Sequence, residues 1–175
     1  MNVLVAFGTK YGSTAKVADA VASELIARGA SVEVVDLRER IPTDLDRYDL
    51  LIVGSPVFIG KWTKPAQEFL RKNADALAKK KVALFACCSD ILFEDKVEAA
   101  RKMYLEDVAG SNGLEPVAMG LFGGEVDFAK YGMFTRFLLS RVGAKEEMEK
   151  KGMDISRPYD FRDWERIRKW ARDLA

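Results

Sequence analysis

Residues 2–14 read NVLVAFGTKYGST, and this stretch decides the fold. An apolar run of strand type occupies Asn2–Phe7, a loop of glycines and hydroxyl side chains follows, and a helical pattern begins at Thr14. Such a loop presents backbone N–H groups and hydroxyls at the positive end of a helix dipole, where a phosphate group binds well. We therefore interpret it as a phosphate-binding loop.

The loop differs from two common phosphate-binding motifs. The glycines of G-x-G-x-x-G are missing and no G-K-[ST] follows, so neither the dinucleotide fingerprint nor the Walker loop fits. The competing interpretation is a plain helix N-cap at Ser13 or Thr14, which would not require the neighbouring glycines. The side chain of Lys10 either faces solvent or adds positive charge. The predicted binding residues of this loop are Thr9, Lys10, Tyr11, Gly12, Ser13 and Thr14.

Strand and helix patterns alternate along the whole chain, which predicts a doubly wound α/β fold with a five-stranded parallel sheet of order 2-1-3-4-5. Ligands bind such a sheet outside the carboxyl ends of strands one and three, and the phosphate loop lies at that edge. We expect one domain over residues 1–175, with an extended, irregular segment over residues 123–158. Strands are expected over residues 2–7, 31–37, 49–54, 81–87 and 115–122, and helices over residues 14–28, 65–78, 94–109 and 161–175.

Composition excludes several classes of function. The formal net charge is +1, so the chain as a whole has no electrostatic attraction to nucleic acid. The chain has no histidine, which excludes a Ser-His-Asp triad, a histidine-based zinc site and a histidine general base. We expect no metal site and no catalytic side chain, and we expect a bound cofactor to carry the chemistry.

The only two cysteines, Cys87 and Cys88, are adjacent and cannot form a disulfide framework. They are either reactive thiols or small buried apolar residues. No apolar run approaches the ~20 residues needed to cross a bilayer, and the chain begins inside its first strand. These features predict a cytoplasmic protein.

The phosphate loop, T-x-Y-G-S-T between a strand and a helix, resembles that of the flavodoxin-like FMN proteins, which reads [ST]-x-[TY]-G-x-T. The resemblance implies that FMN binds at this sheet edge and that two further loops flank its isoalloxazine ring. After strand three, Phe58 or Trp62 would pack on the ring, or both are ordinary core residues. After strand four no stacking tyrosine follows, which leaves one ring face open. The flavin-binding residues implied in these two loops are Pro56, Val57, Phe58, Ile59, Gly60, Cys88 and Ser89.

Residues 55–62, 120–131 and 154–158 are similar to one branch of that family, as are Arg136 and the Asp163-Trp164 pair. This branch contains bacterial quinone-dependent protoporphyrinogen IX dehydrogenases. It implies an FMN-dependent oxidoreductase that oxidises protoporphyrinogen IX, with a quinone or a redox partner protein as acceptor. The alternative is a flavodoxin-type electron-transfer carrier, although such carriers tend to be strongly acidic. A phospho-receiver domain is excluded because the ends of strands one and three lack its acidic residues.

The extended segment contains a predicted basic amphipathic helix. Arginines and a lysine flank its apolar side, and no acidic residue interrupts them. The helix could lie on an anionic membrane surface, cap an apolar small-molecule substrate, or pack on its own domain. Peripheral membrane contact through residues 131–142 is therefore one of the alternatives. The apolar side comprises Tyr131, Met133, Phe134, Phe137, Leu138 and Val142, and the basic residues are Lys130, Arg136 and Arg141.

Overall fold

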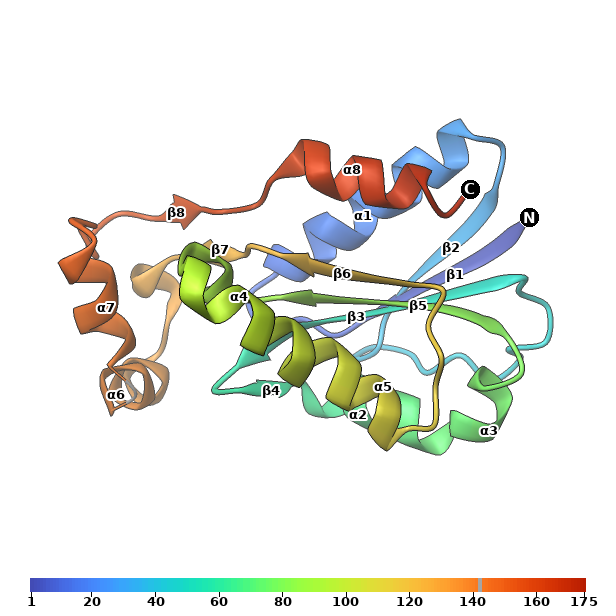
Figure 1. Ribbon diagram of the computed structural model, residues 1–175, viewed down its shortest axis with the longest axis horizontal. Helices are drawn as coiled ribbons and strands as arrows, with labels where there is room; N and C mark the ends of the chain where they lie inside the picture. Colours follow the sequence, from blue (N-terminus) through green and yellow to red (C-terminus); the bar gives the residue numbers. More distant parts are fainter. Residues whose placement is uncertain (142) are drawn as a thin grey trace.

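The computed structural model describes residues 1–141 and 143–175. Its centre is a parallel sheet with helices on both faces (Figure 1). The sheet order is β2-β1-β3-β5-β6, which confirms the predicted order of the five main strands. These strands are β1 (Asn2–Phe7), β2 (Ser31–Asp36), β3 (Leu50–Phe58), β5 (Lys81–Cys87) and β6 (Ala118–Phe122).

Both faces of the sheet are buried, because the central strands are continuously apolar and each face packs on its own layer of helices. Helices α1 (Ser13–Ala27) and α8 (Trp164–Arg172) cover one face. The other face is covered by α2 (Lys64–Lys72), α3 (Ala74–Leu77), α4 (Glu94–Arg101) and α5 (Asp107–Ser111). This arrangement leaves the carboxyl ends of the strands at one end of the molecule.

Several predicted helix and strand boundaries were wrong. The helix expected over residues 65–78 is two helices, because the side chain of Asn73 donates to the Phe69 carbonyl at 2.8 Å and turns the chain. The helix over residues 94–109 is interrupted by a π-helical turn, η2 (Lys102–Glu106), whose Tyr104 carbonyl accepts a hydrogen bond from the Trp62 indole at 2.9 Å. The strand expected to begin at residue 115 begins at residue 118, and the last helix is shorter than expected.

The segment over residues 55–62 is a β-hairpin and not the loop that we predicted. Strand β3 continues to Phe58 and returns as the short antiparallel β4 (Lys61–Trp62). The two turn residues, Ile59 and Gly60, both have left-handed backbones with φ of 49° and 71°. A β-branched residue rarely adopts this conformation, so Ile59 is strained.

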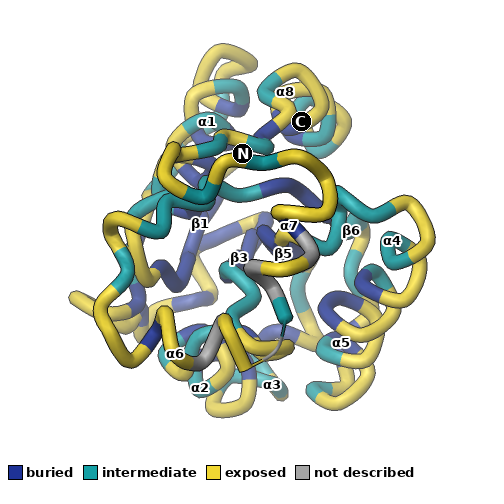
Figure 2. The backbone as a smooth tube through the Cα atoms, turned by 90° about the vertical axis from the view of Figure 1, so that its left-hand side faces the viewer, coloured by how far each residue is buried: buried dark blue, intermediate teal, exposed yellow. Residues whose placement is uncertain are grey.

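The extended segment forms a small substructure at the carboxyl end of the sheet. It contains η3 (Phe128–Lys130), α6 (Met133–Arg141) and α7 (Ala144–Lys150). Its two ends are joined because β7 (Glu125–Val126) pairs with β8 (Tyr159–Asp160) in a separate antiparallel sheet. Figures 1 and 2 show α6 and α7 beyond the ends of the main strands. Within the described residues, no helix is long and apolar enough to cross a membrane.

Candidate functional site

A cavity of about 370 Å³ lies at the carboxyl end of the parallel sheet. The phosphate loop, the β3–β4 hairpin and the turn after β5 form three of its walls, and the extended segment forms the fourth. The structure thus brings together nearly all of the predicted flavin-binding residues, and Gly12 alone of that set does not line the cavity. The predicted residues on its walls are Thr9, Lys10, Tyr11, Ser13, Thr14, Pro56, Val57, Phe58, Ile59, Gly60, Cys88 and Ser89.

A hydrogen bond between Thr9 and Gly12 fixes the phosphate loop, and no side chain caps the start of α1. The buried Thr9 hydroxyl accepts a hydrogen bond from the Gly12 N–H at 3.0 Å. Gly12 has a φ of 87° and occupies the N-cap position of α1, with no side-chain cap. The alternative interpretation, an N-cap at Ser13 or Thr14, is therefore wrong. The first N–H groups of α1 have no capping side chain, and the helix dipole favours an anion there.

Thr14 supplies a second sign that this loop binds an anion. Its hydroxyl is buried and has no hydrogen-bond partner of good geometry among the described residues. The nearby Cys87 thiol interacts with it, but sulfur is a weak hydrogen-bonding group. A buried hydroxyl without a partner costs about 1–3 kcal/mol. A ligand oxygen at the start of α1 would remove that cost, so the residues present fit a phosphate.

Ser13 holds the extended segment as well as the loop. Its hydroxyl accepts a hydrogen bond from the Glu125 N–H at 2.9 Å, and its carbonyl accepts one from the Arg162 guanidinium at 3.3 Å. The hydroxyl proton of Ser13 is not used in the first of these bonds, so the side chain can still donate to a ligand.

Lys10 and Phe58 connect the phosphate loop to the hairpin. The Lys10 ammonium lies 3.3 Å from the centre of the Phe58 ring, a cation–π contact. Lys10 therefore contacts an aromatic ring. The sequence had left open whether its side chain faces solvent or adds positive charge to the loop. Trp62, in contrast, is 4% exposed, belongs to the core beneath α2 and does not line the cavity. Of the two aromatic residues proposed to pack on a flavin ring, only Phe58 lines the cavity.

Acidic side chains near the phosphate loop are paired with cations. Glu125 lies beside Lys130, Arg162 and Lys16, and the Lys130 hydrogen bond in particular lowers the pKa of this carboxyl. The buried Arg162 also binds Asp160 at 2.6 Å. The pairing limits repulsion between these carboxylates and an anion at the start of α1.

Comparison with known proteins gives the family. Residues 4–153 match the family described as the flavodoxin domain. The chain belongs to this family. Protoporphyrinogen IX dehydrogenase [quinone] of Escherichia coli is 22% identical to this flavodoxin-domain chain over 175 residues, which is all of this chain and 95% of the relative.

Two solved structures show the same fold. A short-chain flavodoxin associated with a bacterial microcompartment has a TM-score of 0.60 at 16% identity, with 99% of this chain and 96% of the other covered. A flavoprotein from Lactobacillus acidophilus in complex with FMN has a TM-score of 0.52 at 18% identity, with 69% and 92% covered. At these identities the likeness establishes the fold of this flavodoxin-domain protein.

The two cysteines of the flavodoxin-domain protein point to opposite sides of the sheet, as neighbours on a strand do. Cys87 packs with the core under α1 and α8, and Cys88 with the core on the other face. Burial raises the pKa of Cys87 to about 12 and that of Cys88 to about 11. Both thiols are neutral at physiological pH, which agrees with small buried apolar residues and not with reactive nucleophiles.

Sequence reasoning missed the aromatic and acidic residues that complete the cavity. Tyr131 lies with its ring centre 4.7 Å from that of Tyr11, and the Tyr11 hydroxyl donates to Thr135 at 2.9 Å. On the opposite wall the Tyr104 hydroxyl donates to Asp90 at 2.9 Å, and burial raises the pKa of Tyr104. Other missed wall residues are Cys87, Leu92, Phe93, Lys96, Gly124, Glu125, Val126, Phe128 and Met148.

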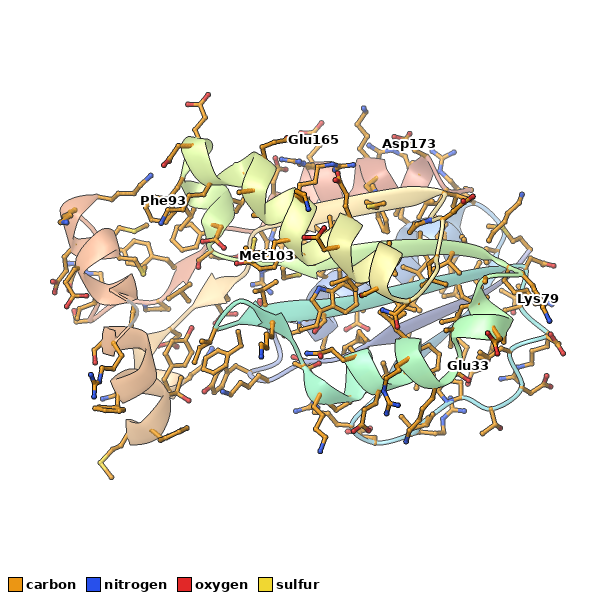
Figure 3. The ribbon with its side chains drawn as sticks, turned by 60° about the horizontal axis from the view of Figure 1, so that its bottom comes forward. Glu33, Lys79, Phe93, Met103, Glu165 and Asp173 are labelled. Atoms are coloured by element: carbon orange, nitrogen blue, oxygen red, sulfur yellow. The ribbon has the colours of Figure 1, made fainter. Side chains whose placement is uncertain are left out.

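The extended segment reaches both walls of the cavity. Its α6 end is attached to the phosphate loop through Thr135. Its α7 end contacts the turn after β5, where the Lys151 ammonium lies 4.3 Å from the centre of the Phe93 ring. Figure 3 shows Phe93 at the end of the molecule that carries this segment. The segment therefore spans the cavity from one wall to the other.

Proposed function

We propose that this flavodoxin-domain protein is an FMN-dependent oxidoreductase that oxidises a protoporphyrinogen-type substrate and passes the electrons to a quinone. The observation that carries the cofactor assignment is the unpartnered Thr14 hydroxyl at the uncapped start of α1, inside the cavity. The reaction is supported by the Escherichia coli relative, which aligns over the whole chain, including the extended segment.

Under this proposal the chain's own residues bind and orient the cofactor. The Thr14 hydroxyl and the first N–H groups of α1 hold the phosphate, while Gly12 allows the backbone to approach it closely. The hairpin residues 56–60 would hold the ring from one wall of the cavity, and Cys88 and Ser89 would hold it from another. When bound, FMN supplies reversible electron and hydride transfer.

The remaining walls suit an apolar substrate. Tyr131 and Phe128 come from the extended segment, with ring centres 5.5 Å apart, and both line the cavity. Aromatic rings packed edge to face provide a large apolar surface that excludes water from the reacting atoms. Substrate and acceptor would approach the cofactor along this surface, and we assign no side chain an essential acid or base role.

The test is reconstitution followed by turnover. Protein freed of ligand is titrated with FMN and followed by quenching of flavin fluorescence. The loaded protein is then mixed anaerobically with protoporphyrinogen IX and a menaquinone or ubiquinone analogue. We expect stoichiometric FMN binding and a rise in porphyrin fluorescence that depends on the quinone. Failure to bind FMN at millimolar concentration contradicts the cofactor, and FMN binding without turnover contradicts the reaction.

The second candidate is a flavodoxin-type electron carrier, which the flavodoxin-domain match also allows. Redox titration of the FMN-loaded protein separates the two. A carrier predicts a stable one-electron state and a very low second potential, whereas the oxidoreductase predicts a two-electron couple. The net charge of +1 favours the oxidoreductase, because negative charge near a flavin lowers the second potential of a carrier.

A further inference from the structure

Helix α6 exposes three large apolar side chains within five residues. Met133, Phe134 and Phe137 are 89%, 73% and 54% exposed, respectively. Single exposed apolar residues are normal on a soluble protein, but adjacent ones on one helix mark an interaction site. Figure 2 shows α6 mostly in the exposed colour at the end of the molecule. We call Met133, Phe134 and Phe137 the α6 patch.

The rest of the helix is held in place, so the α6 patch cannot turn inward without breaking contacts. Thr135 is 6% exposed and accepts the hydrogen bond from Tyr11. The guanidinium of Arg136 donates to the Phe128 carbonyl at 2.9 Å and to the Ala129 carbonyl at 3.3 Å. These bonds orient α6 with its apolar side outward.

The charge around the patch is positive. Helix α6 contains Arg136 and Arg141 and no acidic residue. The Arg141 guanidinium lies 5.3 Å from the centre of the Phe137 ring. In the part of the chain that the structure describes, neither arginine forms an ion pair, whereas Lys130 nearby pairs with Glu125. Exposed aromatic residues beside unpaired arginines complement the headgroups and acyl boundary of an anionic bilayer.

We propose that α6 docks on the surface of an anionic lipid bilayer, with the patch in the headgroup region and Arg136 and Arg141 on lipid phosphates. A second copy of the chain on the same patch would bring arginines against arginines, so the charges favour lipid. Val142, which the sequence placed on this side, lies outside the described residues, and the side chain of Leu138 is not described. The docking does not depend on the proposed reaction.

Docking would also place an apolar groove beside the lipid. Part of α6 lines this groove, through Arg136 and Phe137. Its other lining residues include Phe128, which lines the main cavity as well, and Ile155. An apolar molecule dissolved in the bilayer, such as a quinone, would then meet a groove that shares Phe128 with the main cavity.

Flotation of the full chain with vesicles tests the docking. Vesicles of phosphatidylcholine alone are compared with vesicles that contain phosphatidylglycerol, at low and high salt. We expect binding that is at least tenfold stronger with phosphatidylglycerol and that weakens at high salt. The triple variant Met133→Ala, Phe134→Ala, Phe137→Ala should lose binding at least tenfold. Arg141→Gln, which leaves the Arg136 hydrogen bonds to the Phe128 and Ala129 carbonyls intact, should reduce the preference for the anionic lipid.

Two matched variants control for general hydrophobicity. Met103 is 52% exposed and Val117 is 57% exposed, and neither lies on the extended segment. Figure 3 shows Met103 on the helical layer that covers the sheet. Met103→Ala and Val117→Ala should leave vesicle binding unchanged.

The proposal is wrong if the unmodified chain does not float with anionic vesicles, or if the control variants lose as much binding as the patch variant. It is also wrong if the patch instead drives self-association, seen as a dimer by light scattering that the triple variant abolishes. Circular dichroism and FMN titration of each variant show whether its fold and cofactor site are intact. A failed FMN titration of the unmodified chain would contradict the proposed function and leave the vesicle result valid.

Discussion

Among the described residues, the Thr14 hydroxyl has no hydrogen-bond partner of good geometry, and a phosphate would satisfy it. The same position therefore affects stability and binding in opposite directions. A residue that is poorly satisfied in the free protein is a frequent feature of binding sites, where local rules of packing and polarity are broken for function.

Replacing Thr14 with valine tests both effects. The Thr14→Val variant removes a buried unpaired hydroxyl, so the free protein should gain about 1 kcal/mol in stability in urea unfolding. FMN affinity should fall tenfold or more, because a hydrogen bond to a charged group contributes about 1.5–3 kcal/mol. Thr14→Ser keeps the hydroxyl and should retain the affinity. Equal binding by the valine variant would show that Thr14 does not contact the ligand.

The buried thiols of Cys87 and Cys88 predict loss of stability in alkali. Burial raises both pKa values from 9.0 to about 12 and about 11, so above pH 9 the folded chain holds protons that the unfolded chain releases. The contribution of the two thiols to the free energy of unfolding is fully present below pH 9. Above pH 9 it falls, by up to about 1.4 kcal/mol per pH unit for each thiol. Urea unfolding between pH 8 and 11 should show a shallower fall in the Cys87→Ala, Cys88→Ala variant. Parallel curves would contradict the prediction.

The phosphate loop and the hairpin residues could be predicted because each set is continuous in the sequence and follows a recognisable strand. The partners that complete them could not. Ser13 meets Glu125 and Arg162 across 112 and 149 residues of chain, and Tyr11 meets Thr135 across 124. Periodicity reports local structure and carries no information about which distant side chain will be adjacent.

At the scale of elements, the hydrogen bond between Tyr11 and Thr135 couples the extended segment to the phosphate loop. A double-mutant cycle with Tyr11→Phe and Thr135→Val should give a coupling of about 0.5–1.5 kcal/mol in unfolding. The same cycle measured by FMN titration should also show coupling, because the loop carries the ligand. Additive effects in both measurements would show that the contact is not energetically significant.

Two substitutions in the β3–β4 turn should have opposite effects on stability. Ile59 is strained at a φ of 49°, so Ile59→Gly should stabilise the protein, by about 1 kcal/mol. Gly60 has a φ of 71° and open space around its Cβ position, so Gly60→Ala adds only backbone strain and should cost about 1 kcal/mol. Thermal unfolding measures both. Loss of stability in Ile59→Gly would mean that the contacts of its side chain outweigh the strain.

The same turn shows why this wall was predicted as a loop. Pro56 and Gly60 are residue types typical of loops. Pro56 nevertheless lies within β3, paired in register with Cys87 of β5, and the chain turns only at Ile59. The break at Asn73 and the π-turn at Tyr104 were likewise invisible to periodicity, because each depends on a particular side-chain hydrogen bond.

At the scale of the whole molecule, one sheet supports two separate cores. We predict a single cooperative unfolding transition, because β1, β3 and β5 contribute side chains to both. Trp62 reports on one core, and Trp164 and Trp170 pack against the other. Unfolding is followed by fluorescence and by far-UV circular dichroism, for the unmodified chain and for Trp62→Phe. Within each protein the two probes should give the same midpoint. Different midpoints would indicate two units.

The contacts of α1 with α8 and of Ser13 with Arg162 have a consequence for biosynthesis. The phosphate loop is translated early, but Arg162, which donates to the Ser13 carbonyl, follows Ser13 by 149 residues. A ribosome-bound intermediate that ends before residue 160 would display the loop without the layer that holds it in place. If the proposed function is right, binding of riboflavin 5′-phosphate should therefore require that Arg162 and α8 have been synthesised and have packed on α1.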